Sequence, residues 1–332
     1  MVTNSCMIIG RLIRLDIREA LSKGGKPYVS AVCTLRIGED DNSDELQVRM
    51  FSMKYKKDNS ELASYKGIAT LMTEAKALHK TYRDGDNDAI EIKDDTIVED
   101  ITECEIIKCS SYRDFKFCRL ETSIVTGMDG VEKKYLQINA NYVNRGKEGE
   151  EFNPVNKATL VGKIVKAPVE MEDADENPIM KFTIQVPVFS KGYTKATGEV
   201  VEDKVDLHEF ELVTYDTDMF GVIEDEFQKG NIAYIEAQMV RRIKRVEVEA
   251  STEGRRIIGA VEKKKEYKTE VKELILFLGG YSYDEGELDD TPEFNKELWE
   301  KAMNKESKQE VQQEQPKRDD RMKGGSGAKL PF

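Results

Sequence analysis

The chain has 332 residues, of which 39% are hydrophobic and 35% are charged, and its net charge is −13. No stretch approaches the ~20 apolar residues that span a bilayer, and the start of the chain lacks a secretion-signal pattern. We therefore expect a cytoplasmic protein without a membrane segment. There are two histidines and no phosphate-loop, nucleophile-elbow or zinc-protease motif, so the sequence predicts neither an enzyme nor a cofactor.

Four segments near the start of the chain have the β-branched and aromatic content that is typical of strands. They are "NSCMIIGRLIR" from Asn4, "PYVSAVCTLRIG" from Pro27, "DELQVRMF" from Asp44 and "SYKGIATLMTEAKAL" from Ser64. The third alternates most clearly. Its apolar face holds Leu46, Val48 and Met50, and its other face holds Gln47, Arg49 and Phe51. In the fourth, Gly67 is expected to turn the chain into the strand.

Two further strand-like runs flank the turn "GMDG" between about residues 112 and 145. We interpret them as a hairpin added to a first domain that covers residues 1–145. The polar segment 146–155 contains glycine and proline and predicts a linker.

The same order of segments then repeats, which predicts a second domain over residues 156–280. The counterparts are "NKATLVGKIVK" from Asn156, "PIMKFTIQVPVF" from Pro178, "HEFELVTY" from His208 and "FQKGNIAYIEAQMV" from Phe227. Gly10 and Gly162 fall in register. Two small all-β domains of about five strands each follow, and closed barrels are favoured because closure removes exposed strand edges.

Residues 281–332 are rich in charged residues and glutamine, with too few apolar residues to offset the entropy of ordering. We predict a mostly disordered tail. The five cysteines all precede the linker: Cys6, Cys33, Cys104, Cys109 and Cys118. With an odd number, no C-x-x-C pair and few histidines, we favour buried free thiols over disulfides or a zinc site.

Four motifs of the second repeat, in order, resemble bacterial single-stranded DNA-binding proteins. They are "NKATLVG" (156–162), "KATGE" (195–199), "FQKGNIAYIEAQM" (227–239) and "ELILFLGG" (273–280). The first repeat is a more divergent match, best in "NSCMIIG" and "YKGIATLMTEA". The resemblance covers roughly residues 4–108 and 156–280. It implies two tandem OB-fold barrels, each a five-stranded Greek key, and a possible homo-oligomer. Two barrels in one divergent chain favour a bacteriophage origin.

The resemblance also implies sequence-independent binding of single-stranded DNA during replication, recombination and repair. That family stacks bases on aromatic rings, and the single tryptophan here, Trp299, lies in the tail. Phe51 and Tyr215 fall where the family has a stacking phenylalanine, and Tyr82 and Tyr193 fall near its tryptophans. The neighbouring cations that would contact phosphates are Arg49, Arg83, Lys191 and Lys195. The alternatives are core or domain-interface rings for the first two aromatics and exposed loop tyrosines without a role for the others.

Because the net charge is negative, any anion-binding surface must be local. A basic hairpin is predicted between the last two strands of the second barrel. Its candidate phosphate ligands are Arg241, Arg242, Lys244, Arg245, Arg255 and Arg256. The alternating charges of "RVEVE" leave a plain solvated surface as the alternative for part of this segment.

The chain ends in Leu330, Pro331 and Phe332, which resembles the apolar tip by which the family recruits partners. The tip is expected to bind a replication or recombination protein. The alternatives are a random terminus and a tail that competes with DNA for the cations of the barrels. For the whole chain, the alternative function is an RNA-binding or recombination-mediator protein on the same barrel.

Overall fold

A computed structural model gives the fold. It describes residues 4–40, 43–56, 58–110, 118–126, 132–140, 143–147, 149–190, 193–194, 200–201, 204–249 and 265–283. The predicted disordered tail lies outside these residues from position 284 onward, and so does its tip. None of the described helices is long and apolar enough to cross a membrane.

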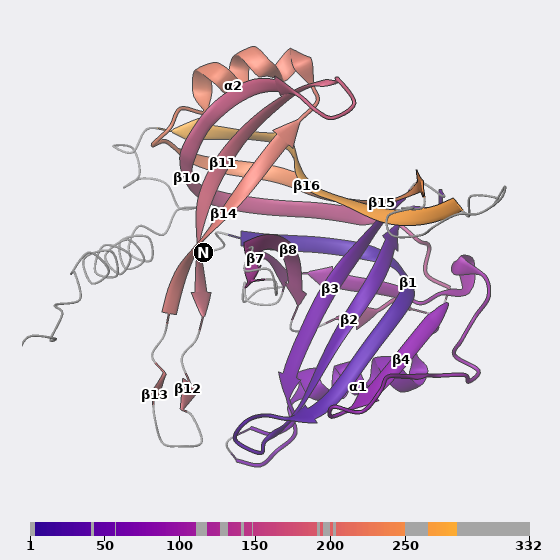
Figure 1. The fold of residues 1–332 in the computed structure, drawn as a ribbon. Coiled ribbons are helices and arrows are strands. Elements are labelled where there is room, and N and C mark those ends of the chain that lie inside the picture. The colour runs from indigo at the N-terminus through magenta and orange to yellow at the C-terminus, as the bar shows by residue number, and fades with distance from the viewer. Residues whose placement is uncertain are drawn as a thin grey trace, which may run out of the picture.

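Five strands close the second barrel (Figure 1). They are β10 (Val155–Glu172), β11 (Pro178–Ser190), β14 (Lys204–Thr214), β15 (Ile232–Glu249) and β16 (Lys265–Tyr283). The first three form an antiparallel meander, β14 runs parallel to β16, and β15 pairs with both β16 and β10. The short helices η2 (Thr217–Met219) and α2 (Phe220–Glu226) precede β15. This is the closed Greek-key order of an OB-fold.

The first barrel has the same order, with its fourth and fifth strands each in two pieces. Strands one to three are β1 (Asn4–Leu21), β2 (Pro27–Ile37) and β3 (Asp44–Met53). The fourth is β6 (Ile106–Ser110) and β7 (Cys118–Thr126), and the fifth is β8 (Glu132–Ala140) and β9 (Asn144–Arg145). As in the second barrel, the third and fifth strands are parallel, the fifth pairs with the fourth, and the fourth pairs with the first. The chain is therefore all-β, with two tandem OB-fold barrels.

One segment of the first barrel has no counterpart in the second. It follows helix α1 (Ala63–Glu74) and contains β4 (His79–Asp84), β5 (Ile90–Glu91) and the short helix η1 (Ile101–Glu103). β4 runs parallel to the second half of β1 and so extends the sheet by one strand. The ribbon of β12 (Tyr193–Thr194) and β13 (Val200–Val201) is peculiar to the second barrel and lies beyond the ends of β11 and β14 (Figure 1).

Two predictions for the first domain were wrong. The segment that begins at Ser64 was expected to be the fourth strand, yet most of it is helix α1, and Gly67 lies within that helix. Tyr65, Ile68 and Leu71 are buried at a spacing of three residues, which is helical. The hairpin at about 112–145 is not an addition, because β8 pairs with β3 and supplies the fifth strand of the barrel. Its partner β7 continues the fourth.

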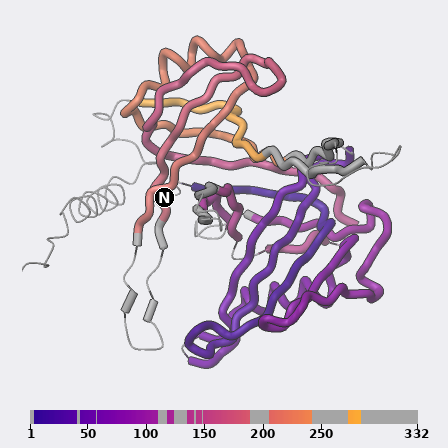
Figure 2. Tube along the Cα trace, viewed as in Figure 1, coloured from indigo at the N-terminus to yellow at the C-terminus, as the bar shows by residue number. Residues whose placement is uncertain are grey.

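A pseudo-twofold axis relates the two barrels, one on each side of the β1–β10 pair (Figure 2). These strands pair antiparallel, and Cys6 lies opposite Ala158. Each of these residues lies two positions beyond the asparagine that begins its repeat, Asn4 or Asn156. The axis therefore passes between Cys6 and Ala158. All the described strands except those of the β12–β13 ribbon belong to one continuous sheet.

The two asparagines make the same contact. The side chain of Asn4 donates to the carbonyl of Leu120 at 2.6 Å and accepts from its N–H at 2.9 Å. Asn156 makes the same pair of bonds to the backbone of Met239. Each asparagine thus ties the start of the first strand to the fourth strand, and Leu120 and Met239 are counterparts.

The contacts between the barrels are also duplicated. The N–H of Arg241 on β15 donates to Asp44 on β3 at 3.1 Å. At the matching place, the N–H of Thr122 on β7 donates to Nδ1 of His208 on β14 at 3.0 Å. The fourth strand of each barrel is therefore held against the third strand of the other.

The alternation predicted for residues 44–51 is confirmed, because Leu46, Val48 and Met50 are buried on β3. All five cysteines are buried free thiols, as predicted. Burial raises the pKa of Cys33 to about 12, so that thiol stays protonated at neutral pH. The last strand runs to Tyr283, three residues beyond the predicted end of the second domain.

Candidate nucleic-acid interface

The outer face of the first barrel is a four-stranded surface formed by β4, β1, β2 and β3. Because alternate residues of a strand share a face, the strand registers place side chains in rows across it. One row contains Arg83, Arg18, Ser30 and Phe51. The neighbouring row contains Thr81, Asp16, Val32 and Arg49. We call this surface the first outer face.

An aromatic pair lies at one end of the first outer face. The side chain of Phe51 is 54% exposed, and its ring centroid lies 5.3 Å from that of Tyr28 on β2. Phe51 points away from the barrel core, so core packing does not account for an aromatic residue here. An exposed, partly supported ring is the geometry that base stacking requires.

Four arginines lie on the same face as this pair, and they differ in how they are held. Arg14 forms an ion pair with Asp16 at 2.9 Å, and Arg18 pairs with Asp86 at 2.6 Å. Arg49 and Arg83 are exposed and have no polar partner among the residues that the structure describes. Their guanidinium groups remain available to an anion, and guanidinium suits phosphate well because of its planar set of donors.

The prediction that Tyr82 is a surface ring was wrong. Tyr82 is partly buried and packs against the core, on the opposite face of β4 from Arg83. Its hydroxyl donates to Glu19 at 3.2 Å, and the hydroxyl of Tyr65 donates to the same carboxylate at 2.8 Å. Burial raises the pKa of the Tyr82 hydroxyl, and the charge of Glu19 adds to this effect. Tyr82 therefore helps to hold β4 and α1 against β1.

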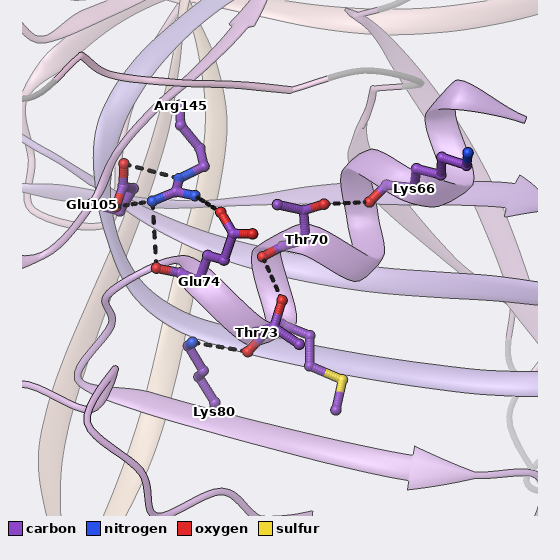
Figure 3. Close-up of polar contacts among 8 residues, drawn as sticks. Lys66, Thr70, Thr73, Glu74, Lys80, Glu105 and Arg145 are labelled. Carbon is purple, nitrogen blue, oxygen red and sulfur yellow. Dashed lines mark hydrogen bonds and ion pairs between the residues drawn. The ribbon is translucent and has the colours of Figure 1, made fainter.

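A buried lysine anchors β4 from below. The Nζ of Lys80 donates to the carbonyl of Met72, at the end of α1, at 3.0 Å and to the hydroxyl of Thr96 at 2.5 Å. Burial lowers the pKa of Lys80, and the charge of Asp94 partly opposes this. At the same end of α1, Arg145 pairs with Glu74 and Glu105 (Figure 3). These contacts fix the strand that carries Arg83.

Tyr215 is the counterpart of Phe51 in the second barrel. On the fifth strand, Ile138 lies opposite both Val48 and Leu120, the residue that Asn4 binds. In the second barrel, Ile275 lies opposite both Leu212 and Met239, the residue that Asn156 binds. Val48 and Leu212 therefore occupy the same position of the third strand. Phe51 and Tyr215 each lie three residues further along. Tyr215 is 38% exposed, and its hydroxyl donates to Asp173 at 3.2 Å. The two rings therefore occupy matching positions of the two barrels.

Arg241 does not extend into solvent as the basic-hairpin prediction requires. Its side chain is 13% exposed, and its Nε pairs with Glu273 at 2.9 Å. Its Nη1 donates to the carbonyl of Glu45 in the first barrel at 3.2 Å. The hairpin itself is confirmed, because β15 and β16 pair as far as Glu249 and Lys265. The backbone N–H of Arg241 also binds the first barrel, so this residue connects the two barrels.

Several predicted residues remain untested. For Arg242, Lys244 and Arg245 the structure gives only their backbone, on β15, and for Tyr193 only its place on β12. The others lie outside the described residues: Lys191, Lys195, Arg255, Arg256, Leu330, Pro331 and Phe332. Within the described ranges, no group of three or more histidine, cysteine or acidic side chains is arranged to hold a metal ion.

Three members of the first outer face were not predicted from the sequence: Tyr28, Arg14 and Arg18. The available signal was the hairpin register. Because Ser30 lies opposite Phe51 on β3, Tyr28 reaches that ring diagonally. Arg18 lies opposite Ser30 from β1.

No protein-family model and no curated protein sequence matches this chain. Among solved structures, the chain is similar to the wild-type single-stranded DNA-binding protein of Thermus aquaticus, with 12% identity and a TM-score of 0.45 over 85% of this chain and 94% of that one. A deletion mutant of the Thermus aquaticus protein has 13% identity and a TM-score of 0.44 over 88% of this chain and 98% of that one. The Plasmodium falciparum single-stranded DNA-binding protein, in complex with single-stranded DNA, has 15% identity and a TM-score of 0.26 over 41% of this chain and 100% of that one.

Proposed function

We propose that this chain binds and protects single-stranded DNA without sequence preference. The observation that carries the proposal is that the exposed ring of Phe51, in contact with Tyr28, shares the first outer face with the exposed Arg49 and Arg83. A single strand offers base faces that stack on rings and phosphates that attract cations, and neither contact depends on the base sequence. We further propose that this activity serves DNA replication, recombination and repair in a bacterial or phage-infected cytoplasm.

The test compares matched oligonucleotides of single-stranded DNA, RNA and duplex DNA at several salt concentrations. For single-stranded DNA, log K should fall linearly with log salt, with a slope of about −0.7 for each phosphate that is neutralised. A preference for duplex DNA, or a flat response to salt, would contradict the proposal. A clear preference for RNA would support the alternative of an RNA-binding protein on the same barrel.

We also propose that Leu330, Pro331 and Phe332 recruit a replication or recombination protein. The support is compositional, because an apolar terminus follows a polar tail with little apolar surface to pack against. Deleting residues 324–332 should abolish capture of the partner while leaving thermal stability and DNA affinity nearly unchanged. A loss of stability on this deletion would instead make the tip part of the fold.

A further inference from the structure

The two barrels present the same outer face at matching places, but its side chains differ. Two residues before the ring, the first barrel has Arg49 and the second has Val213. Two residues earlier still, Gln47 is matched by Glu211. On the first strand, Arg18 lies opposite Ser30, whereas the corresponding residue of the second barrel, opposite Ile179, is Met171. At these three positions the second barrel lacks two cations and has one more carboxylate. At two neighbouring positions, Lys181 and Val169 stand where the first barrel has Val32 and Asp16.

Two cations lie on the second face: Lys166, which matches Arg14 and is exposed, and Lys181, which is engaged by a neighbour. Lys181 lies opposite Val213 and forms an ion pair with Glu211 at 3.2 Å. Tyr215 is bonded to Asp173, whose carboxylate also accepts backbone N–H groups from Asn177 and Asp175. These bonds, with that to Asn177 the largest cause, lower the pKa of Asp173 to about 2, so a negative charge stays beside the ring. A phosphate near Tyr215 would meet this charge.

The second barrel also lacks the strand that widens the first outer face. Its chain passes from α2 to β15 with a short turn at Gly230, so nothing corresponds to β4 and Arg83. In the first barrel, β4 covers an edge of β1. The corresponding edge of β10 is uncovered, and Val169 on it is 59% exposed. In the first barrel, four strands at a spacing of ~4.8 Å place Arg83 and Phe51 at opposite ends of a row ~14 Å long.

We infer that the first outer face alone holds the nucleic-acid strand, and that the second barrel supports it without a strand-binding face of its own at the matching place. Bases stack on Phe51 and Tyr28, and the phosphates lie toward Arg49 and Arg83. The inference rests on the proposed function and specifies which barrel performs it. It predicts one strand-binding face for each chain.

The test uses matched alanine variants of the full chain, with an oligo-dT of about eight nucleotides, a length within the ~4–16 that one OB-fold binds. Phe51→Ala should weaken binding about 5- to 150-fold, as expected for loss of one stacked base. Tyr215→Ala should change the affinity less than about twofold. Both rings are exposed, so unchanged melting temperatures should confirm that each variant is folded. The wild-type chain should bind one such oligonucleotide.

A charge pair gives a second, independent readout. Arg49→Ala should flatten the slope of log K against log salt by about 0.7, whereas Lys181→Ala should leave it unchanged. The asymmetry is wrong, although the proposed function stands, if Tyr215→Ala has as large an effect as Phe51→Ala or Lys181→Ala as large an effect as Arg49→Ala. It is also wrong if two short oligonucleotides bind each chain. If the wild-type chain binds no oligo-dT at low salt, both fail.

Discussion

The two barrels share one topology but close in different ways. In the second, β10 pairs with β15 over six consecutive residue pairs, from Ala158 to Lys163. In the first, β1 pairs with β6, and the described residues include no ladder between β1 and β7. There the side chain of Asn4 makes the polar link to Leu120. In the first barrel the β1 ladder therefore holds β6 and not β7, whereas in the second barrel the single strand β15 has both the ladder and the bonds to Asn156.

The comparison also shows how one fold acquires a surface at a single place. The β4 segment inserted between α1 and the fourth strand covers an edge of β1, adds Arg83 and is anchored underneath by Lys80. The second barrel keeps the same strands without this addition. The difference between the barrels therefore lies in an insertion and in outward-facing residues, while the closed core order is unchanged.

The largest effect is expected at the two asparagines. Asn4→Ala would leave the buried N–H and carbonyl of Leu120 without partners, at ~1–3 kcal/mol for each group, so about 2–6 kcal/mol in total. Asn156→Ala should cost less, about 1–2 kcal/mol, because the neighbouring ladder keeps β10 on β15. Urea unfolding followed by circular dichroism would measure both changes. Equal losses would mean that the seam of the first barrel is no weaker than that of the second.

The two matching glycines should follow in size. A Cβ at Gly162 would lie 2.4 Å from the carbonyl oxygen of Gln185, whereas one at Gly10 would lie 2.7 Å from Cδ1 of Ile37 and 2.9 Å from the carbonyl oxygen of Arg36. Overpacking costs ~1–3 kcal/mol, and we expect the larger cost for Gly162→Ala, because its backbone contact is the closer one.

Amide hydrogen exchange of the two variants would assign each loss to its barrel. Gly162→Ala should accelerate exchange in β10 and β11, and Gly10→Ala in β1 and β2. The opposite order of stabilities would show that the backbone near Gln185 moves aside more easily than the side chain of Ile37.

The smallest effect is a dependence on pH that only the first barrel should show. Because burial lowers the pKa of Lys80, the unfolded chain binds more protons between the folded-state pKa and the ordinary value near ~10.4. The free energy of unfolding should therefore rise with pH through that window. Below the folded-state pKa, Lys80 is charged in both states and its burial destabilises the fold by the full amount. Lys80→Met should remove this rise. An identical pH slope in wild type and variant would mean that Lys80 titrates normally.

Parts of this architecture follow from the sequence because they depend on local patterns. The alternation of Leu46, Val48 and Met50 predicted both faces of β3, and the repeated segments that begin at Asn4 and Asn156 predicted two similar barrels. The exposed position of Phe51 followed from the same alternation. Such features are readable because side chains of a strand alternate whatever the strand pairs with.

Other parts depended on contacts between residues far apart in the sequence. The apolar run that contains Tyr65, Ile68 and Leu71 suits either a short strand or a helix, and only its packing beside β2 and β3 selected the helix. Arg241 belongs to a basic run, but the carbonyl of Glu45 in the other barrel determines where its side chain lies. Tyr82 is turned inward by Glu19, more than 60 residues away. The tertiary structure decided these features because each depends on which distant strand lies alongside.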